Sequence, residues 1–147
     1  MINVIGLGYI GLPTALMFAK SGKKVVGTDI NKDLINSLTE GKLTFEEAGL
    51  DELFYDAIKN GIEFTTEYQK TETYIIAVPT PYMKESKKLD PKYVISAVNS
   101  VLDVCDKGAT LIVESTVTPG STDKYIRPEI EKRGFIIGQD VHLVHAP

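Results

Sequence analysis

The stretch Gly6-Leu7-Gly8-Tyr9-Ile10-Gly11 fits the pattern G-x-G-x-x-G, and its place in the chain decides the predicted fold. It follows a short apolar run at residues 2–5 and leads into a predicted helix at residues 9–20, where apolar side chains recur at helical spacing. A strand, a glycine loop and a helix in this order are typical of a dinucleotide-binding unit. The first glycine permits the tight turn, the second lets a pyrophosphate approach the backbone, and the third lets the helix pack close to the strand.

An acidic residue stands where such a unit needs one. Asp29 follows the second predicted strand, residues 24–28, and lies 21 positions after Gly8. A carboxylate there accepts hydrogen bonds from the adenosine ribose and repels a 2′-phosphate, so it favours NAD over NADP. Asp29 could instead cap the helix expected near Asn31, and the nearby Lys32 could soften the discrimination against NADP. Combined with the glycine loop, the pattern favours contact between Asp29 and NAD.

Strands and helices alternate along the rest of the chain. This order predicts a doubly wound α/β domain of three layers, with a mostly parallel sheet between two layers of helices. The predicted strands are apolar on both faces, as helix-covered parallel strands are. Strands are expected at residues 2–5, 24–28, 63–66, 74–78, 110–113 and 141–144, and helices at 9–20, 33–38, 50–60, from Pro91 onward and at 122–133.

The composition is that of one globular domain. The chain has 147 residues, 43% of them hydrophobic and 24% charged, with a net charge of −4, so it can bury a core and is not expected to bind nucleic acid or an anionic membrane. No segment is long enough to cross a bilayer, and no charged leader precedes an apolar run. The single Cys suits a reducing compartment, which predicts a cytoplasmic protein. The two His and one Cys lack ligand spacing, so no metal site is predicted.

Two unusual loops follow predicted strands at the sheet edge where ligands bind in this fold. Val78-Pro79-Thr80-Pro81 follows one strand, and Glu114-Ser115-Thr116-Val117-Thr118-Pro119-Gly120 follows another. The prolines hold the backbone of Thr80 extended and fix its direction. The structural alternatives are a rigid turn at Thr80, and helix capping or a turn at Ser115 and Thr116. The position of both loops at strand ends favours a binding function.

With these loops, the sequence resembles the N-terminal domain of the UDP-glucose/GDP-mannose dehydrogenase family over nearly its whole length. The glycine string and the Val-Pro-Thr-Pro loop are closest to the branch that acts on UDP-N-acetylmannosamine. The resemblance implies an enzyme that oxidises the C6 alcohol of a UDP-sugar to a carboxylate with two molecules of NAD, for surface polysaccharide synthesis. The matching stretches are Val4-Ile5-Gly6-Leu7-Gly8-Tyr9-Ile10-Gly11-Leu12-Pro13, Thr28-Asp29-Ile30-Asn31, Glu46-Glu47-Ala48-Gly49-Leu50, Ile76-Ala77-Val78-Pro79-Thr80-Pro81, Glu114-Ser115-Thr116 and Pro119-Gly120.

The resemblance also implies roles for single residues. Tyr9 and Ile10 would lie over the pyrophosphate, and Asp29 would hold the adenosine ribose. Thr80 would line the cofactor cleft. Thr116 would approach the nicotinamide and help to hold the catalytic water, which makes it the predicted catalytic residue. The full set predicted to bind NAD is Gly6, Gly8, Tyr9, Ile10, Gly11, Asp29, Val78, Thr80 and Thr116.

Some features depart from the family pattern. Ala48 stands where the family often has proline, and Thr118 and Ser121 vary the second loop. Family members continue through a central helix and a second α/β domain, which carry the catalytic Cys, Lys and Asn and most of the sugar contacts. In the family, a catalytic Glu follows the proline that corresponds to Pro147. Residues 1–147 are therefore expected to form an NAD-binding domain without turnover, from an enzyme that is a homodimer or larger.

Three further features are expected to be structural. Cys105 lies on the apolar stripe of its helix and is expected to be a core residue, not a nucleophile. His142 and His145 flank the last strand on opposite faces, and His145 is expected to be structural although it lies near the cleft. The lysine-rich segment 82–89 is expected to be a solvated loop.

Two other functions fit the same glycine loop. The chain could be a stand-alone NAD-binding module without catalysis, since a dinucleotide fold alone establishes no activity. It could also belong to another NAD enzyme, such as a 3-hydroxyacid dehydrogenase. The Val-Pro-Thr-Pro and Glu-Ser-Thr loops count against that second alternative.

Overall fold

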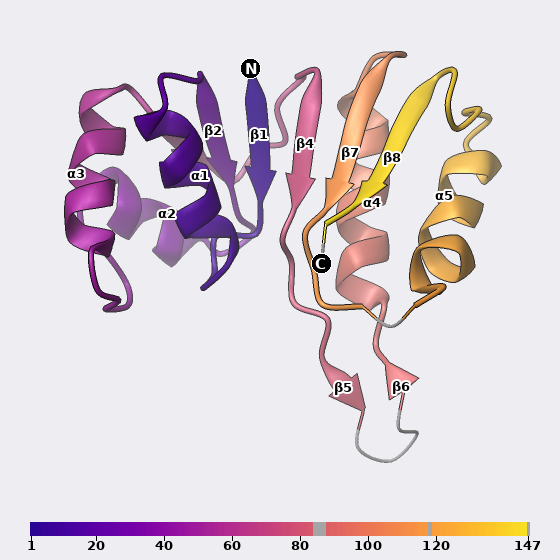
Figure 1. Cartoon of the computed structure of the whole chain (residues 1–147), viewed down its shortest axis with the longest axis horizontal. Coiled ribbons are helices and arrows are strands. Elements are labelled where there is room, and N and C mark those ends of the chain that lie inside the picture. Colours follow the sequence, from indigo (N-terminus) through magenta and orange to yellow (C-terminus); the bar gives the residue numbers. More distant parts are fainter. Residues whose placement is uncertain (84–87, 118, 147) are drawn as a thin grey trace.

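The chain folds around a sheet of six strands in the order β3-β2-β1-β4-β7-β8, in which every neighbouring pair is parallel (Figure 1). The computed structural model describes residues 1–83, 88–117 and 119–146. This topology confirms the predicted doubly wound α/β fold. The strands are β1 (Ile2–Ile5), β2 (Val25–Thr28), β3 (Glu63–Thr65), β4 (Thr73–Ile76), β7 (Ala109–Val113) and β8 (Val141–His145).

Helices cover both faces of the sheet because neighbouring residues of each strand point to opposite sides. In β1, Val4 joins a buried cluster with Leu16 and Phe54, whereas Ile5 joins a second cluster with Val98 on the other face. The first face is covered by α1 (Gly11–Lys20), α2 (Lys32–Thr39) and α3 (Leu50–Lys59), and the second by α4 (Lys92–Val104), the π-helix η1 (Thr122–Ile126) and α5 (Arg127–Lys132). Figure 1 shows α1 and α4 on either side of the central strands.

The helix expected at 122–133 is two elements, which corrects the prediction. Its first part is the π-helix η1 and only Arg127–Lys132 is α-helical. Pro128 explains the change, because it has no N–H to bond back to the carbonyl of Lys124 as an α-helix requires. The other predicted elements are present with bounds that differ by at most two residues.

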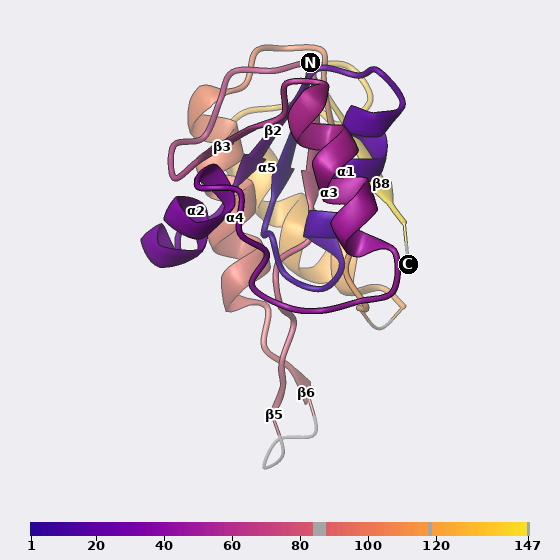
Figure 2. The same cartoon turned by 90° about the vertical axis from the view of Figure 1, so that its left-hand side faces the viewer.

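The segment expected to be a loop at 82–89 contains a small hairpin instead. Strands β5 (Tyr82–Met83) and β6 (Lys88–Leu89) pair antiparallel and form a separate sheet. The hairpin projects beyond the edge of the main sheet at which β4 and β7 end (Figures 1 and 2). Residues 84–87, which are half of the predicted lysine-rich loop, and Thr118 lie outside the described residues. Within the described ranges, no helix combines the length and apolar character needed to span a membrane.

Candidate functional site

A pocket of about 600 Å³ opens at the carboxyl edge of the sheet. It lies where the chain leaves β1 for one face of the sheet, through α1, and β4 for the other face, through α4. This switch point is where open α/β sheets bind their ligands. The pocket is lined by the glycine loop, the end of β2, the loops after β4 and β7, and the first turns of α4.

Two glycines of the loop are required by the protein's own packing. Gly6 has a φ of +88°, and a Cβ there would lie 2.8 Å from the carbonyl oxygen of Ala77. A Cβ on Gly11 would lie 1.7 Å from the carbonyl oxygen of Gly6. These contacts leave no space for a side chain, so the turn and the close approach of α1 to β1 and β4 both need glycine.

Gly8 differs, because nothing in the described structure lies within 4 Å of where its Cβ would stand. Its backbone is outside the left-handed region, and the residue lines the pocket. The fold therefore gives no reason for glycine at this position. A ligand that approaches the backbone closely would give one, and the pyrophosphate of a dinucleotide does so at this glycine.

The start of α1 offers hydrogen-bond donors to that ligand. Within the described residues, the N–H groups of Gly8, Tyr9 and Ile10 have no acceptor. No side chain of the described residues caps α1, and the first turn of α1 carries no acidic residue. Unpaired N–H groups and the positive end of the helix dipole favour an anionic group at this place. The glycine loop thus fits a pyrophosphate both in space and in charge.

Asp29 joins the end of β2 to the glycine loop. Its Oδ2 accepts a hydrogen bond from the N–H of Leu7 at 2.8 Å, and its Oδ1 accepts one from the N–H of Asn31 at 2.9 Å. The alternative that Asp29 caps α2 is wrong, because the side chain of Asn31 does so by accepting from the N–H groups of Asp33 and Leu34. A carboxylate can accept about four hydrogen bonds, so Asp29 keeps acceptor capacity for ribose hydroxyls at the pocket wall.

Side-chain bonds lock the two loops at the other end of the pocket. The hydroxyl of Thr80 donates to the carbonyl of Thr116 at 3.0 Å, and the hydroxyl of Ser115 donates to the carbonyl of Val78 at 3.0 Å. The ring Nε2 of His145 lies 3.3 Å from the carbonyl oxygen of Ser115. Ser115 therefore cross-links loops and caps no helix. The side chain of Thr116 is exposed and faces the pocket.

The structure brings the predicted residues together, with one qualification for Gly11. Gly6, Gly8, Tyr9, Ile10, Asp29, Val78, Thr80 and Thr116 all line the pocket. Gly11 does not line the pocket; it allows the close packing of α1 described above. Lys32 is not among the described residues that line the pocket, so it does not oppose the charge of Asp29 from the pocket wall. The roles of these residues toward NAD stay predictions.

Several residues that line the pocket were not predicted from the sequence. Tyr93, Ser96 and Ala97 share one face of α4, at the spacing i, i+3 and i+4, and Tyr68 contributes from the loop after β3. Burial raises the pKa of the Tyr68 hydroxyl. The α4 residues could have been predicted, because α4 begins beside the Val-Pro-Thr-Pro loop at the edge of the sheet where ligands bind. No sequence pattern pointed to Tyr68.

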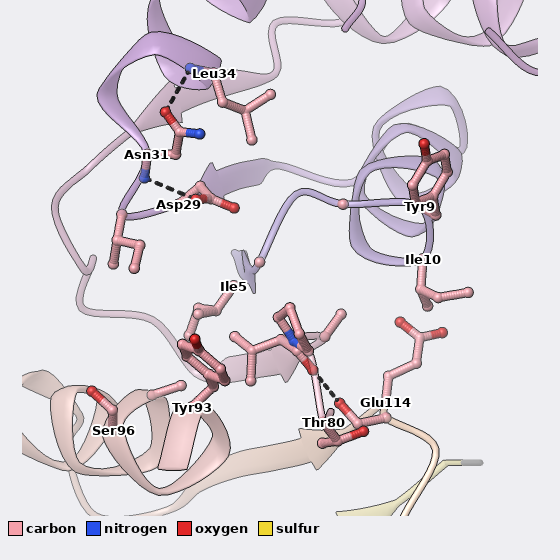
Figure 3. A pocket seen from close by; sticks show the side chains of 18 of the residues that line it. Ile5, Tyr9, Ile10, Asp29, Asn31, Leu34, Thr80, Tyr93, Ser96 and Glu114 are labelled. Atoms are coloured by element: carbon pink, nitrogen blue, oxygen red, sulfur yellow. Dashed lines mark hydrogen bonds between the residues drawn. The ribbon is translucent and has the colours of Figure 1, made fainter. Parts of the chain in front are cut away.

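Tyr9 contacts an aromatic ring that lies outside the pocket lining. Its ring lies 4.5 Å, centre to centre, from the ring of Phe45 in the loop between α2 and α3. Tyr9 is nonetheless 73% exposed, so one side of its ring remains available to a ligand. Figure 3 shows Tyr9 and Ile10 along one wall, Asp29 at one side and Glu114 beneath Ile10.

Cys105 takes no part in this site. It follows α4 as its C-terminal cap and packs against the core cluster on that face of the sheet. Burial raises the pKa of its thiol, the reverse of what a nucleophilic cysteine needs. The interpretation of Cys105 as a structural residue is thus supported.

Known proteins share this fold and sequence. The model of the UDP-glucose/GDP-mannose dehydrogenase family, NAD binding domain, matches residues 1–147. The UDP-N-acetyl-D-mannosamine dehydrogenase of Methanococcus vannielii is 41% identical over 99% of this chain and 33% of its own length. The solved structure of the UDP-N-acetyl-mannosamine dehydrogenase Cap5O from Staphylococcus aureus is 43% identical, with a TM-score of 0.93 over 99% of this chain and 36% of that one.

A more distant relative has the same architecture. GDP-mannose dehydrogenase from Pseudomonas aeruginosa, solved as a ternary complex, is 27% identical, with a TM-score of 0.86 over 97% of this chain and 34% of that one. The chain spans about a third of the length of the relatives it matches. The match over all 147 residues decides against the 3-hydroxyacid dehydrogenase alternative. The chain belongs to the UDP-glucose/GDP-mannose dehydrogenase family, as its NAD-binding domain.

Proposed function

We propose that residues 1–147 hold NAD for an enzyme that oxidises the C6 alcohol of a UDP-sugar to a carboxylate, with UDP-N-acetylmannosamine as the sugar nucleotide. The choice of sugar rests on the names of the relatives with 41% and 43% identity. The observation that carries the proposal is the glycine loop, where open space at Gly8 meets unpaired N–H groups. The cytoplasm, which the single cysteine favours, and surface polysaccharide synthesis belong to the same proposal.

Different residues of this chain bind different parts of the cofactor. The N–H groups of Gly8, Tyr9 and Ile10 bind the pyrophosphate, and Asp29 accepts from the ribose hydroxyls. The loops joined by the Thr80–Thr116 bond orient the nicotinamide end and keep it in one position. Bound NAD supplies the hydride acceptor, and an alcohol must give up two hydrides to become a carboxylate.

Thr116 is proposed to act in the step that uses water. Its backbone is held by Thr80, and its side chain is free to face the reacting end of the pocket. A hydroxyl in this position can orient a water molecule toward the sugar carbon without itself changing charge. No cysteine lies in the pocket wall among the described residues, so these residues supply no thiol for the covalent intermediate of the second oxidation.

Calorimetric titration with NAD, and separately with NADP, tests the proposal. The expected result is saturable binding of NAD and at least tenfold weaker binding of NADP, because the carboxylate of Asp29 repels the added phosphate. In Asp29→Asn, which keeps an acceptor oxygen but no charge, the preference for NAD shrinks. Asp51→Asn, an exposed change on α3, is the matched control and leaves both affinities as they were. Failure of the wild-type chain to bind NAD would refute the proposal.

A further inference from the structure

Glu114 carries a carboxylate oxygen that the protein leaves without a partner. The residue directly follows β7, and its Oε1 accepts from the hydroxyl of Thr14 on α1 at 3.2 Å. Its Oε2 is buried and has no hydrogen-bond partner within the described residues. A buried acceptor without a partner costs free energy, and such groups in folded proteins call for an explanation.

The charge of Glu114 is also uncompensated. No lysine or arginine of the described residues forms an ion pair with it. The described residues that line the pocket include the carboxylates of Glu114 and Asp29 but no lysine, arginine or histidine. A partly buried negative charge in such a place is favourable only beside a group of opposite charge. The pocket therefore suits a ligand that brings a positive charge to Glu114.

The sheet order fixes where along the ligand that charge must be. Asp29 follows β2 and Glu114 follows β7, with β1 and β4 between them, so three strand spacings of about 4.8 Å separate their strands. Figure 3 shows Asp29 and Glu114 at opposite sides of the pocket, with Ile10 above Glu114. A dinucleotide with its ribose at Asp29 and its pyrophosphate on the glycine loop extends its nicotinamide end toward Glu114.

The nicotinamide ring is the part of the cofactor whose charge changes. It is positive in oxidised NAD and neutral in NADH. We propose that Glu114 is a specificity-determining residue that makes this pocket bind oxidised NAD in preference to NADH; this rests on the proposed function. The same preference helps the reduced form to leave, which an enzyme that uses two NAD molecules in turn requires.

A hydrogen bond alone would behave differently. The carboxamide of the nicotinamide carries the same N–H donors in both forms of the cofactor, so an acceptor at Glu114 would strengthen both equally. Only the charge of the carboxylate separates the two forms. The ratio of the two dissociation constants therefore distinguishes a charge effect from a hydrogen-bond effect.

The test measures Kd for NAD by calorimetry and for NADH by its fluorescence, in wild type and Glu114→Gln. Glutamine keeps the shape and an oxygen for Thr14 but has no charge. We expect the ratio Kd(NAD)/Kd(NADH) to rise at least tenfold in Glu114→Gln. Glu63→Gln makes the same change of charge at an exposed position of β3, and should leave the ratio unchanged.

Thermal unfolding provides a second readout for the same variant. Removal of a buried, unpaired charge should leave the melting temperature of Glu114→Gln equal to or above that of wild type. An unchanged ratio in a folded Glu114→Gln would overturn the inference, whether both affinities fall together or neither does. If the wild type binds neither form, the proposed function itself is wrong, and this result is distinct from an unchanged ratio.

Discussion

Gly8→Ala separates the needs of the fold from the needs of the ligand. A methyl group at Gly8 meets no described atom within 4 Å apart from its chain neighbours, and the φ of Gly8 lies outside the left-handed region. The variant should therefore fold with equal stability, or with about 0.4–1 kcal/mol more, because alanine restricts the unfolded chain. If the glycine loop binds the pyrophosphate as proposed, the methyl group occupies the space that the pyrophosphate needs.

The expected loss of affinity follows from the hydrogen bonds at stake. A hydrogen bond to a charged group contributes about 1.5–3 kcal/mol. Displacement of the pyrophosphate from two of the unpaired N–H groups would cost about 3–6 kcal/mol, which is more than a hundredfold in Kd. Urea unfolding measures the stability, and calorimetry measures the binding of NAD. Wild-type affinity in Gly8→Ala would refute the assignment of the pyrophosphate to this loop.

Changes at Gly11, Thr80 and Cys105 give three further predictions. Gly11→Ala forces a Cβ to within 1.7 Å of the carbonyl oxygen of Gly6, so we expect a loss of several kcal/mol of stability or no folded protein, seen by circular dichroism; a stable variant would contradict the packing described. Thr80→Val removes the bond to Thr116 and should weaken NAD binding severalfold while it changes the unfolding free energy by about 1 kcal/mol or less; equal NAD affinity would show that the loop bond does not orient the cofactor. Because burial raises the pKa of Cys105, less thiolate is present near pH 8.5 than in a free thiol, so alkylation there should be slower than in the urea-unfolded chain, and equal rates would contradict it.

Much of the fold could be predicted from the sequence because local sequence patterns indicate most of its strands, helices and turns. Glycine spacing, apolar strands and amphipathic helices all pointed to one parallel sheet, and tertiary packing agreed with them. The π-helix was missed because a helical period does not distinguish α from π hydrogen bonding. The β5–β6 hairpin was missed because strands of two residues, such as Tyr82–Met83, are too short to show alternation.

The candidate site was predictable where a residue acts through its own motif. Gly8 and Asp29 lie in patterns with a known physical purpose, and the structure places both in the pocket wall. Tyr68 and Tyr93 reach the pocket only because the sheet order brings distant segments together. Glu114 was predicted as part of a loop, but that its Oε2 is buried without a partner depends on the folded structure, which no sequence pattern reveals.

The most direct test of the central claim follows the amide signals of the glycine loop during titration with NAD. A two-dimensional nitrogen–proton spectrum reports each backbone N–H separately. The account predicts that the signals of Gly8, Tyr9 and Ile10 shift most and saturate together, because their free N–H groups acquire the phosphate oxygens as acceptors. Saturable shifts elsewhere, with these three signals unmoved, would contradict it.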